Sequence, residues 1–296
     1  MISGKHVIDG INLDASPMHF KSIAHARDHY LELAEGWKPY NPKPVVKMHA
    51  GVRVVRDDLI VGTKTRGGDL YMSRIPEKTV VYTQMRMGLA GIAVIDCARH
   101  HNKRVVLFMP ASHKISEHQA CCIAQGAKPI FKRCAAQNNL SVWAAEWCKK
   151  HRAAFAPLGL KHPLVTAALV HTAVGIKPPE ECYIPISTGV LARALQIAWP
   201  KTKFTCIAVS RNLQAGELGS AKVITEPLAF HAFEKEENLP PYPSVLAYDA
   251  KVWKYAKAYA DKHPDKDVLI WNVGTDPVLH DRSIIDRTKS WREWGE

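Results

Sequence analysis

The sequence predicts an α/β fold in which parallel strands are joined by crossover helices. Short segments rich in β-branched residues alternate with longer segments of helical apolar spacing, and one strand–helix unit takes roughly 25 residues. Hydrophobic residues make up 47% of the 296-residue chain, which is enough for a large core. This length and composition fit one large domain or two domains of medium size.

The strand–helix alternation is clearest between residues 79 and 133. The β-branched segments predict strands at Thr79–Gln84, Arg104–Pro110 and Lys128–Arg133. The segments between them predict helices at Gly88–Asn102 and Ser116–Gly126, and the second of these ends in glycine, as helices commonly do.

The second half of the chain repeats this pattern. Apolar segments predict strands at Cys182–Ser187, Phe204–Ser210, Ala221–Glu226 and Asp267–Gly274, and helices at His162–Ile176 and Gly189–Pro200. We therefore expect a small α/β domain over residues 75–155 and a large domain formed by residues 1–74 and 156–296. A cleft between two such domains is the first place to look for a ligand site.

The charge of the chain is strongly positive. Lys and Arg number 40 against 28 Asp and Glu, which gives a net charge of +12, spread from end to end. Such a surface attracts anions, and polyanions most of all. Nucleic acid is therefore an expected partner or substrate, although many basic enzymes bind only small phosphorylated molecules.

The cysteines and the apolar segments place the chain among intracellular proteins. Seven cysteines lie mostly in apolar segments and form no CxxC pair, which favours reduced, buried thiols over disulfides or zinc. The pair His100–His101 is typical of an exposed helix end, so we expect no metal site. The chain begins without the apolar stretch of a signal peptide, and no apolar run is long enough to cross a bilayer. We expect a soluble, cytoplasmic protein.

The segment "DDLIVGTKTRGGDL" places a lysine, Lys64, among small residues next to an acidic turn and a helix start. A lysine amine forms a Schiff base with an aldehyde when its pocket is partly desolvated. Glycines at 62, 67 and 68 would let a flat ring approach the backbone closely. A solvated lysine in an ordinary turn is the alternative.

The segment "CYIPISTGVLARALQIA" predicts a strand that ends in Ser187-Thr188-Gly189 and is followed at once by a helix. Backbone amides and small hydroxyls at a helix N-terminus form a cradle for phosphate. The alternative is a Ser or Thr that caps an ordinary strand–helix turn.

Two later segments carry further polar residues at informative places. "VLAYDAKVW" contains Tyr248 and Lys251 after a proline-rich loop, and "VLIWNVGTDP" is a buried strand that ends in Asn272, Gly274 and Thr275. Parallel α/β sheets bind ligands at the carboxyl ends of their strands, so these residues are candidates for ligand contacts.

In this order, the four segments resemble fold type II pyridoxal-phosphate enzymes, the tryptophan synthase β-like family. The resemblance is greatest to the branch of aminocyclopropane-carboxylate deaminase and D-cysteine desulfhydrase. "DDLIVGTKTR" matches its acidic turn and lysine, "ISTGVLARAL" its phosphate loop, "AYDAKVW" loosely a late tyrosine segment, and "NVGTDP" its last strand end. The similarity runs over about residues 45–277 and implies a two-domain fold with the active site in the interdomain cleft.

The resemblance also implies roles for individual residues and a cofactor, pyridoxal 5'-phosphate. Lys64 would carry the cofactor and act as the base at the substrate Cα, and Tyr248 would lie near the substrate or the ring face. Asn272 or Thr275 would lie near the pyridine nitrogen. Relatives are commonly dimers, so a homodimer is implied. The cofactor phosphate would be held by Ser187, Thr188, Gly189, Val190 and Leu191.

One segment departs from the family pattern. Where the family has a serine and an asparagine after the second strand, this chain reads "TQMRMGLAG", and its phosphate loop has a single glycine. The site for the substrate carboxylate is therefore altered. Thr83, Gln84 and Arg86 are the candidate substrate-binding residues, and Arg86 could receive a carboxylate through two hydrogen bonds.

The stretch "PPYPS…YDAKVW" and the basic surface also resemble a set of bacteriophage-encoded proteins, some of which hypermodify thymine in viral DNA. We therefore expect a lyase that decarboxylates a glycine- or serine-derived aminoacyl group attached to a modified thymine. The first alternative is a deaminase or β-lyase that acts on a free amino acid. The second is a non-catalytic scaffold that binds DNA or a partner.

Overall fold

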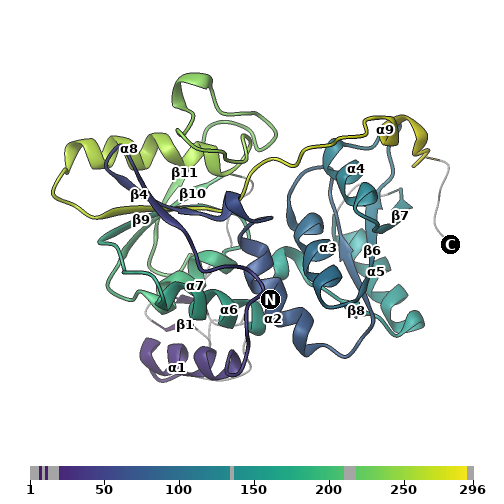
Figure 1. The fold of residues 1–296 in the computed structure, drawn as a ribbon, viewed down its shortest axis with the longest axis horizontal. Coiled ribbons are helices and arrows are strands. Elements are labelled where there is room, and N and C mark those ends of the chain that lie inside the picture. Colours follow the sequence, from purple (N-terminus) through teal and green to yellow (C-terminus); the bar gives the residue numbers. More distant parts are fainter. Residues whose placement is uncertain (1–6, 9–10, 13–19, 134–136, 210–217, 292–296) are drawn as a thin grey trace. The chain divides into compact units, whose positions relative to one another are not determined.

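The computed structural model describes residues 7–8, 11–12, 20–133, 137–209 and 218–291. The chain divides into two compact units (Figure 1). Unit 1 consists of Met1–Leu70 and Lys161–Thr275, and unit 2 consists of Tyr71–Leu160 and Asp276–Glu296. The first boundary falls inside helix α2 (Thr63–Arg74).

Unit 1 is built on a six-stranded sheet with the strand order β11-β10-β9-β12-β4-β3. Neighbouring strands are parallel except for the edge hairpin of β3 and β4. In sequence order the strands are β3 (Val46–His49), β4 (Val52–Arg56), β9 (Glu181–Ile186), β10 (Lys203–Ala208), β11 (Lys222–Thr225) and β12 (Val268–Asn272). A separate short hairpin pairs β1 (Val7–Ile8) with β2 (Ile11–Asn12).

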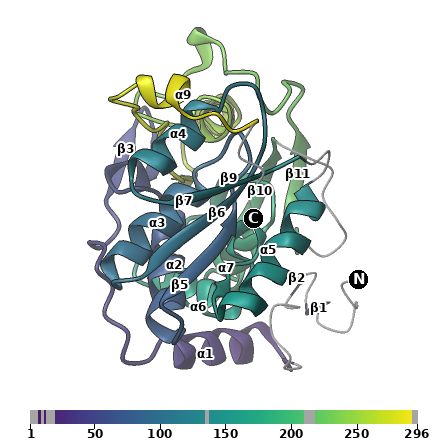
Figure 2. The same cartoon turned by 90° about the vertical axis from the view of Figure 1, so that its right-hand side faces the viewer.

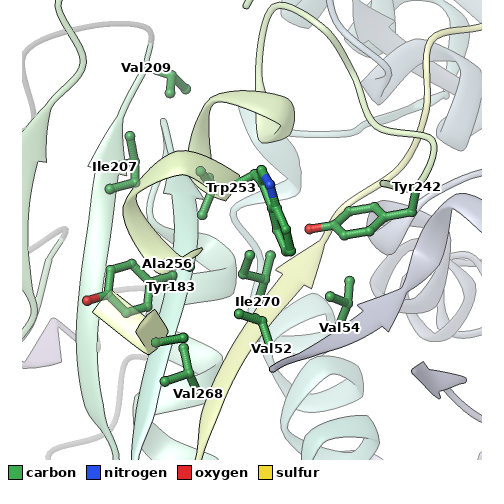
Figure 3. Packing of buried hydrophobic residues seen from close by; sticks show 12 residues of the cluster. Val52, Val54, Tyr183, Ile207, Val209, Tyr242, Trp253, Ala256, Val268 and Ile270 are labelled. Atoms are coloured by element: carbon green, nitrogen blue, oxygen red, sulfur yellow. The ribbon is translucent and has the colours of Figure 1, made fainter. Parts of the chain in front are cut away.

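Helices cover both faces of this sheet. Helix α8 (Trp253–Lys262) lies on one face, while α6 (Pro163–Val174) and α7 (Val190–Ala198) lie on the other, with α1 (Ile23–Leu33) packed outside them (Figure 1). Figure 3 shows the core beneath α8, where Trp253 packs against alternate residues of the strands, such as Val52, Val54 and Ile270. Because every second strand residue points to this face, the β-branched pattern produces the core directly.

Unit 2 has a four-stranded, fully parallel sheet with the order β7-β6-β5-β8. Helix α5 (Gln137–His151) covers one face, and α3 (Ala90–His100) and α4 (Glu117–Ala124) cover the other (Figure 2). The strands are β5 (Thr79–Thr83), β6 (Arg104–Pro110), β7 (Lys128–Lys132) and β8 (Ala154–Phe155).

The last part of the described chain belongs to unit 2, whereas the sequence assigned residues 276–296 to the large domain. The physical reason is a set of polar contacts around α9 (Ser283–Arg287). Arg282 forms an ion pair with Glu117 at 2.5 Å, and the amide of Ser112 donates to the hydroxyl of Ser290 at 3.1 Å. Such contacts between charged or polar residues leave no apolar pattern from which the docking could be predicted.

The described residues contain no helix that is long and apolar enough to cross a membrane. Six cysteines lie in the described part of the chain, and all six are buried and unbridged. Burial raises the pKa of the Cys122 thiol to about 12, so this group is protonated and unreactive at neutral pH.

Candidate active site

Three neighbouring strands of unit 1 bring the predicted site residues to one edge of the sheet. Strands β4, β12 and β9 are adjacent and parallel, so their carboxyl ends lie side by side. The chain leaves β4 toward Lys64, leaves β9 toward the 187–191 loop, and leaves β12 toward Thr275. Ligand sites of parallel α/β sheets are found at this edge.

The end of β12 joins two parts of the site through one residue, Val273. Its carbonyl oxygen accepts a hydrogen bond from the Thr63 amide at 2.9 Å, which fixes the start of the helix that carries Lys64. Its amide donates to the Asp249 carboxylate at 2.9 Å, and the Gly274 amide donates to the same oxygen at 3.2 Å. The turn before Lys64 and the Asp249 carboxylate are therefore both held by the end of β12.

Lys64 is the second residue of α2 and is partly buried. Removal from water lowers the pKa of its amine below the ordinary value of 10.5, and the Asp249 carboxyl partly opposes this shift. The positive end of the helix dipole also disfavours a cation in the first turn. A lysine with a lowered pKa has more neutral amine available as a nucleophile near pH 7.

A buried carboxylate, Asp57, fixes the turn in front of Lys64. It is fully buried in the 3-10 turn η2 (Asp57–Leu59), and one of its oxygens accepts from the Arg66 guanidinium at 2.7 and 2.9 Å. The other oxygen accepts from the Thr63 hydroxyl at 2.7 Å and from the Trp271 indole at 2.9 Å. The "DDL…TKTR" motif thus builds a rigid support for the lysine.

Gly62 allows the close approach of this turn to β12. Its φ is +130°, and a Cβ built on it would lie 2.8 Å from the Val273 carbonyl oxygen. Gly62→Ala is therefore expected to destabilise unit 1 by about 1–3 kcal/mol and to weaken cofactor binding, because the start of α2 must shift. Urea unfolding and a cofactor titration would measure both effects.

Gly51→Ala is the matched control for this substitution. Gly51 also has a positive φ, +85°, but open space surrounds its Cβ position. It should show the backbone cost alone and leave cofactor binding unchanged. Equal losses in both variants would contradict a specific role for the contact between Gly62 and Val273.

Asp249 is a site residue that the sequence reasoning missed. It opens the 3-10 turn η5 (Asp249–Val252), is 3% exposed, and accepts from the amides of Val245, Val273 and Gly274. Desolvation raises the pKa of Asp249 from its ordinary 3.8 to about 7, although these amides lower it. The sequence signal is in "AYDAKVW", where Asp249 directly follows the candidate Tyr248.

The raised pKa of Asp249 predicts a specific pH dependence of stability. The native state binds a proton that the unfolded state releases between about pH 4 and pH 7, so the contribution of Asp249 to stability falls as the pH rises through this range. The stability of the cofactor-free wild type relative to Asp249→Asn is expected to fall by roughly 4 kcal/mol from pH 4 to pH 8. Urea unfolding at several pH values measures this difference, and a constant difference would contradict the shift.

The predicted phosphate loop connects β9 to α7 as the sequence indicated. Gly189 has a left-handed conformation (φ +70°) and carries no side chain that could cap the helix. The first amides of a helix have no acceptors within it, and they favour an anion. Ser187 and Thr188 are partly exposed, and the buried Arg193 guanidinium donates to the Thr188 carbonyl at 3.2 Å. A cation therefore lies directly behind the loop.

Three other predicted residues lie near the end of β12 or directly before η5. Thr275 and Tyr248 are partly buried, and the Tyr248 ring packs edge-on against Phe230. Asn272 is fully buried: its amide nitrogen donates to Asp58 and to the Pro243 carbonyl, and its oxygen accepts from Ser244. These bonds hold the loop before Asp249, and a cofactor contact of Asn272 stays a prediction.

The predicted substrate-binding residues belong to unit 2, where Thr83 ends β5 and Gln84 and Arg86 lie in the loop after it. The Gln84 amide is used within its own loop, since it donates to the carbonyls of Met85 and Gly88 and accepts from the Gly91 amide. Arg86 is exposed and donates to the Ser112 hydroxyl and the Lys114 carbonyl. The Thr83 hydroxyl is buried and has no hydrogen-bond partner among the described residues. Their role toward a substrate stays a prediction.

The donor set of unit 1 fits the polar groups of pyridoxal phosphate. A partly buried lysine suits the aldehyde, the α7 terminus with its hydroxyls suits the phosphate, and the buried Asp249 suits the ring nitrogen as its counter-charge. A metal alternative lacks support, because no group of three or more His, Cys, Asp or Glu side chains in the described residues could hold an ion.

Comparison with solved structures shows which proteins share this fold. Threonine deaminase isoform 2 from Solanum lycopersicum aligns with a TM-score of 0.67 and 15% identity over 86% of this chain and 85% of its own. An ACC deaminase homologue aligns with a TM-score of 0.65 and 15% identity, covering 83% and 94%. Escherichia coli diaminopropionate ammonia lyase aligns with a TM-score of 0.61 and 14% identity, covering 94% of each chain.

Searches of family models and of curated proteins gave no match. The structural similarity is therefore a similarity of fold. In these three comparisons it covers 83–94% of this chain and 85–94% of the other protein. The predicted fold class is confirmed: the chain has the α/β architecture of fold type II, with parallel sheets and flanking helices, which it shares with deaminases and lyases of amino acids.

Proposed function

We propose that this protein is a pyridoxal-phosphate-dependent lyase that acts at the Cα of an amino acid. The observation that carries the proposal is the arrangement at the end of β12, where Val273 holds both the Lys64 turn and Asp249. The uncapped start of α7 follows the adjacent strand β9. Lys64 suits the aldehyde of a single cofactor, Asp249 its ring nitrogen, and the start of α7 its phosphate.

The residues of unit 1 would divide the work as follows. Lys64 would bind the cofactor aldehyde and move the proton at the substrate Cα, and its lowered pKa suits both tasks. Asp249 would favour a protonated ring nitrogen, while the start of α7 holds the phosphate. When bound, the cofactor withdraws electrons from Cα, so that loss of a proton or of carbon dioxide becomes feasible.

For the substrate, we propose an aminoacyl group that is glycine- or serine-derived and attached to a modified thymine in phage DNA, and we propose decarboxylation as the reaction. The support is the net charge of +12 and the altered loop after β5, which lacks the serine and asparagine of the family pattern. A substrate whose side chain is a nucleic acid would need both a cationic surface and a different carboxylate site.

A deaminase or β-lyase acting on a free small amino acid is the second candidate. It is supported by the structural neighbours, which include a threonine deaminase, a homologue of ACC deaminase and diaminopropionate ammonia lyase. The two candidates differ in the product and in the size of the substrate, and these differences make them separable by experiment.

A substrate comparison tests the proposed reaction. Protein reconstituted with pyridoxal phosphate would be incubated with an oligonucleotide that carries a serine- or glycine-derived group on thymine, and separately with free serine and threonine. Carbon dioxide release from the oligonucleotide, absent with Lys64→Ala, is the expected result. Ammonia and a 2-oxo acid from free amino acids would establish the second candidate, and no turnover of any substrate would overturn both.

A further inference from the structure

Lys and Arg occur along the whole chain, but the expectation of an evenly spread net charge is wrong, because most of it comes from one segment of unit 2. Residues 71–160 contain 13 Lys and Arg but only four Asp and Glu, so this stretch accounts for most of the net charge of +12. Composition alone does not show whether these side chains gather on one face, and the topology of the sheet answers that question.

The amino ends of the four parallel strands in unit 2 lie along one edge of the sheet, and each has basic residues. Arg104 and Lys128 are the first residues of β6 and β7, Lys78 directly precedes β5, and Arg152 lies just before β8. Thr79 and Arg104, the first residues of β5 and β6, are paired in the sheet, so the two strands begin at the same position along the strand direction. We define the basic rim as Lys78, Arg104, Lys128, Lys149, Lys150 and Arg152.

All six rim side chains are exposed, and the surroundings add further cations. Lys103 lies close enough to Lys78 to have its pKa lowered, chiefly by desolvation and also by that charge. Only one acidic residue, Glu77, occurs in the turns that lead into the four strands. These turns are residues 74–79, 99–104, 125–128 and 149–154. The rim is thus a row of like charges with little compensation.

Helix stabilisation does not explain the whole rim. Cations in the last turn of a helix interact favourably with its dipole, and this accounts for Lys149 and Lys150 in α5. Lys78, Arg104 and Lys128 each lie four residues beyond the end of a helix, α2, α3 and α4 respectively, and so outside the last turn in which the dipole acts. Mutual repulsion of these charges costs stability, which favours a role in binding over a role in folding.

The rim lies at the opposite edge of the sheet from the predicted substrate loop. Thr83 is the last residue of β5 and Lys78 directly precedes its first, so roughly 16 Å of strand separates the two edges. A ligand on the rim is therefore bound away from Thr83, Gln84 and Arg86. The rim is suited to a long polyanion that extends well beyond the reacting group.

We propose that the basic rim of unit 2 binds the phosphate backbone of duplex DNA without reading its sequence. Duplex DNA carries about one negative charge per 1.7 Å of its axis, and a row of Lys and Arg gains affinity by releasing its counterions. Lys and Arg side chains are the usual contacts to phosphate oxygens in protein–DNA interfaces, and such backbone contacts carry no sequence information. This surface deepens the proposed DNA-linked function but does not depend on the cofactor.

The test is a charge-neutralised triple variant, Arg104→Gln, Lys128→Gln and Lys150→Gln, compared with a matched control. The control, Lys201→Gln, Lys222→Gln and Lys262→Gln, removes three equally exposed cations from unit 1. Anisotropy of a labelled random-sequence duplex would be followed between about 50 and 200 mM salt. The rim variant should bind at least ~10-fold more weakly near 0.1 M and show a salt slope lower by about 2–3.

The control should bind the duplex within about 2-fold of wild type, because nonspecific affinity follows the phosphates contacted and its changed residues lie outside the rim. Equal weakening of both variants, unchanged binding by the rim variant, or no binding by wild type would overturn the proposal. So would binding of wild type to vesicles of anionic phospholipid but not to the duplex. The visible absorbance with pyridoxal phosphate should be the same in both variants, which separates failure of the rim from failure of the proposed chemistry.

Discussion

Lys64→Ala is expected to abolish the visible absorbance that pyridoxal phosphate acquires on binding to this protein. The absorbance requires a covalent link between a lysine amine and the cofactor aldehyde, and the partly buried Lys64 has the lowered pKa that such a lysine needs. Activity should fall by about 10³-fold or more, because the proposed function assigns the proton transfer at Cα to the same residue. Absorbance titration of both proteins is the measurement.

The fold of the variant should be intact, because Asp57, Thr63 and Arg66 hold the turn without Lys64. Reduction of the wild-type complex with borohydride, followed by peptide mass mapping, identifies the linked lysine directly. Lys251 is the internal comparison, since it is also buried and its pKa is also lowered by desolvation, but its amine donates to the Ala229 carbonyl. The label is expected on Lys64.

A label on Lys251, or one spread over many surface lysines, would show that Lys64 is not the cofactor lysine. Absence of any absorbance in the wild type would remove the enzyme proposal altogether. In that case the non-catalytic scaffold that binds DNA or a partner becomes the better description, and the basic rim would be its functional surface.

The sequence predicted the local structure of those parts of the candidate site that are encoded within short segments. The turn with Lys64 and the Ser187-Thr188-Gly189 loop each lie at a strand–helix junction, where strand pattern, small residues and helix start are adjacent in the chain. The structure places both at the carboxyl edge of one sheet. They follow β4 and β9, the two strands on either side of β12. Such patterns can be predicted because their backbone geometry depends on residues that are neighbours in the chain.

The supporting contacts could not be predicted, because their partners are far apart in the chain. The Trp271 indole donates a hydrogen bond to Asp57, which lies 214 residues earlier in the chain. The Asp249 carboxylate accepts a hydrogen bond from the amide of Val273, which lies 24 residues later. Short or polar elements were missed for a related reason. Strand β8 has only two residues, and the antiparallel edge strand β3 alternates Val and Met with Lys and His. Strand β3 does alternate apolar and polar residues, but over four residues only, and β8 is shorter still, so neither is long enough for a clear prediction.

Asp57→Asn is expected to lower the free energy of unfolding of unit 1 by about 3–5 kcal/mol. The carboxylate has no solvent exposure and accepts four hydrogen bonds, two of them from the nearly buried Arg66. The Asn side chain keeps one acceptor oxygen, but its NH2 group replaces the second oxygen. That group carries two donors and faces partners that are themselves donors. The guanidinium is then left as a buried charge without its counter-ion, which is the costly outcome. Urea unfolding of the cofactor-free protein measures the change.

Asp261→Asn provides the matched control, because it removes a carboxylate from the exposed pair with Lys257 on α8. That pair is screened by water, so the control should lie within about 0.5 kcal/mol of wild type. If Asp57→Asn does not fold, the milder Trp271→Phe removes one donor to the same carboxylate and should cost about 1–3 kcal/mol. A loss below about 1 kcal/mol for Asp57→Asn would mean that Arg66 finds other partners.

The cofactor gives this prediction a second consequence. Asp57 binds Thr63, the residue before Lys64, so weakening the turn must also weaken the site. A ligand that binds the native state stabilises it according to its affinity. Added pyridoxal phosphate should therefore raise the stability of wild type and of Asp261→Asn equally, and that of Asp57→Asn by less. Equal stabilisation of all three proteins would contradict this prediction. It would show that Asp57 contributes to folding but does not position Lys64.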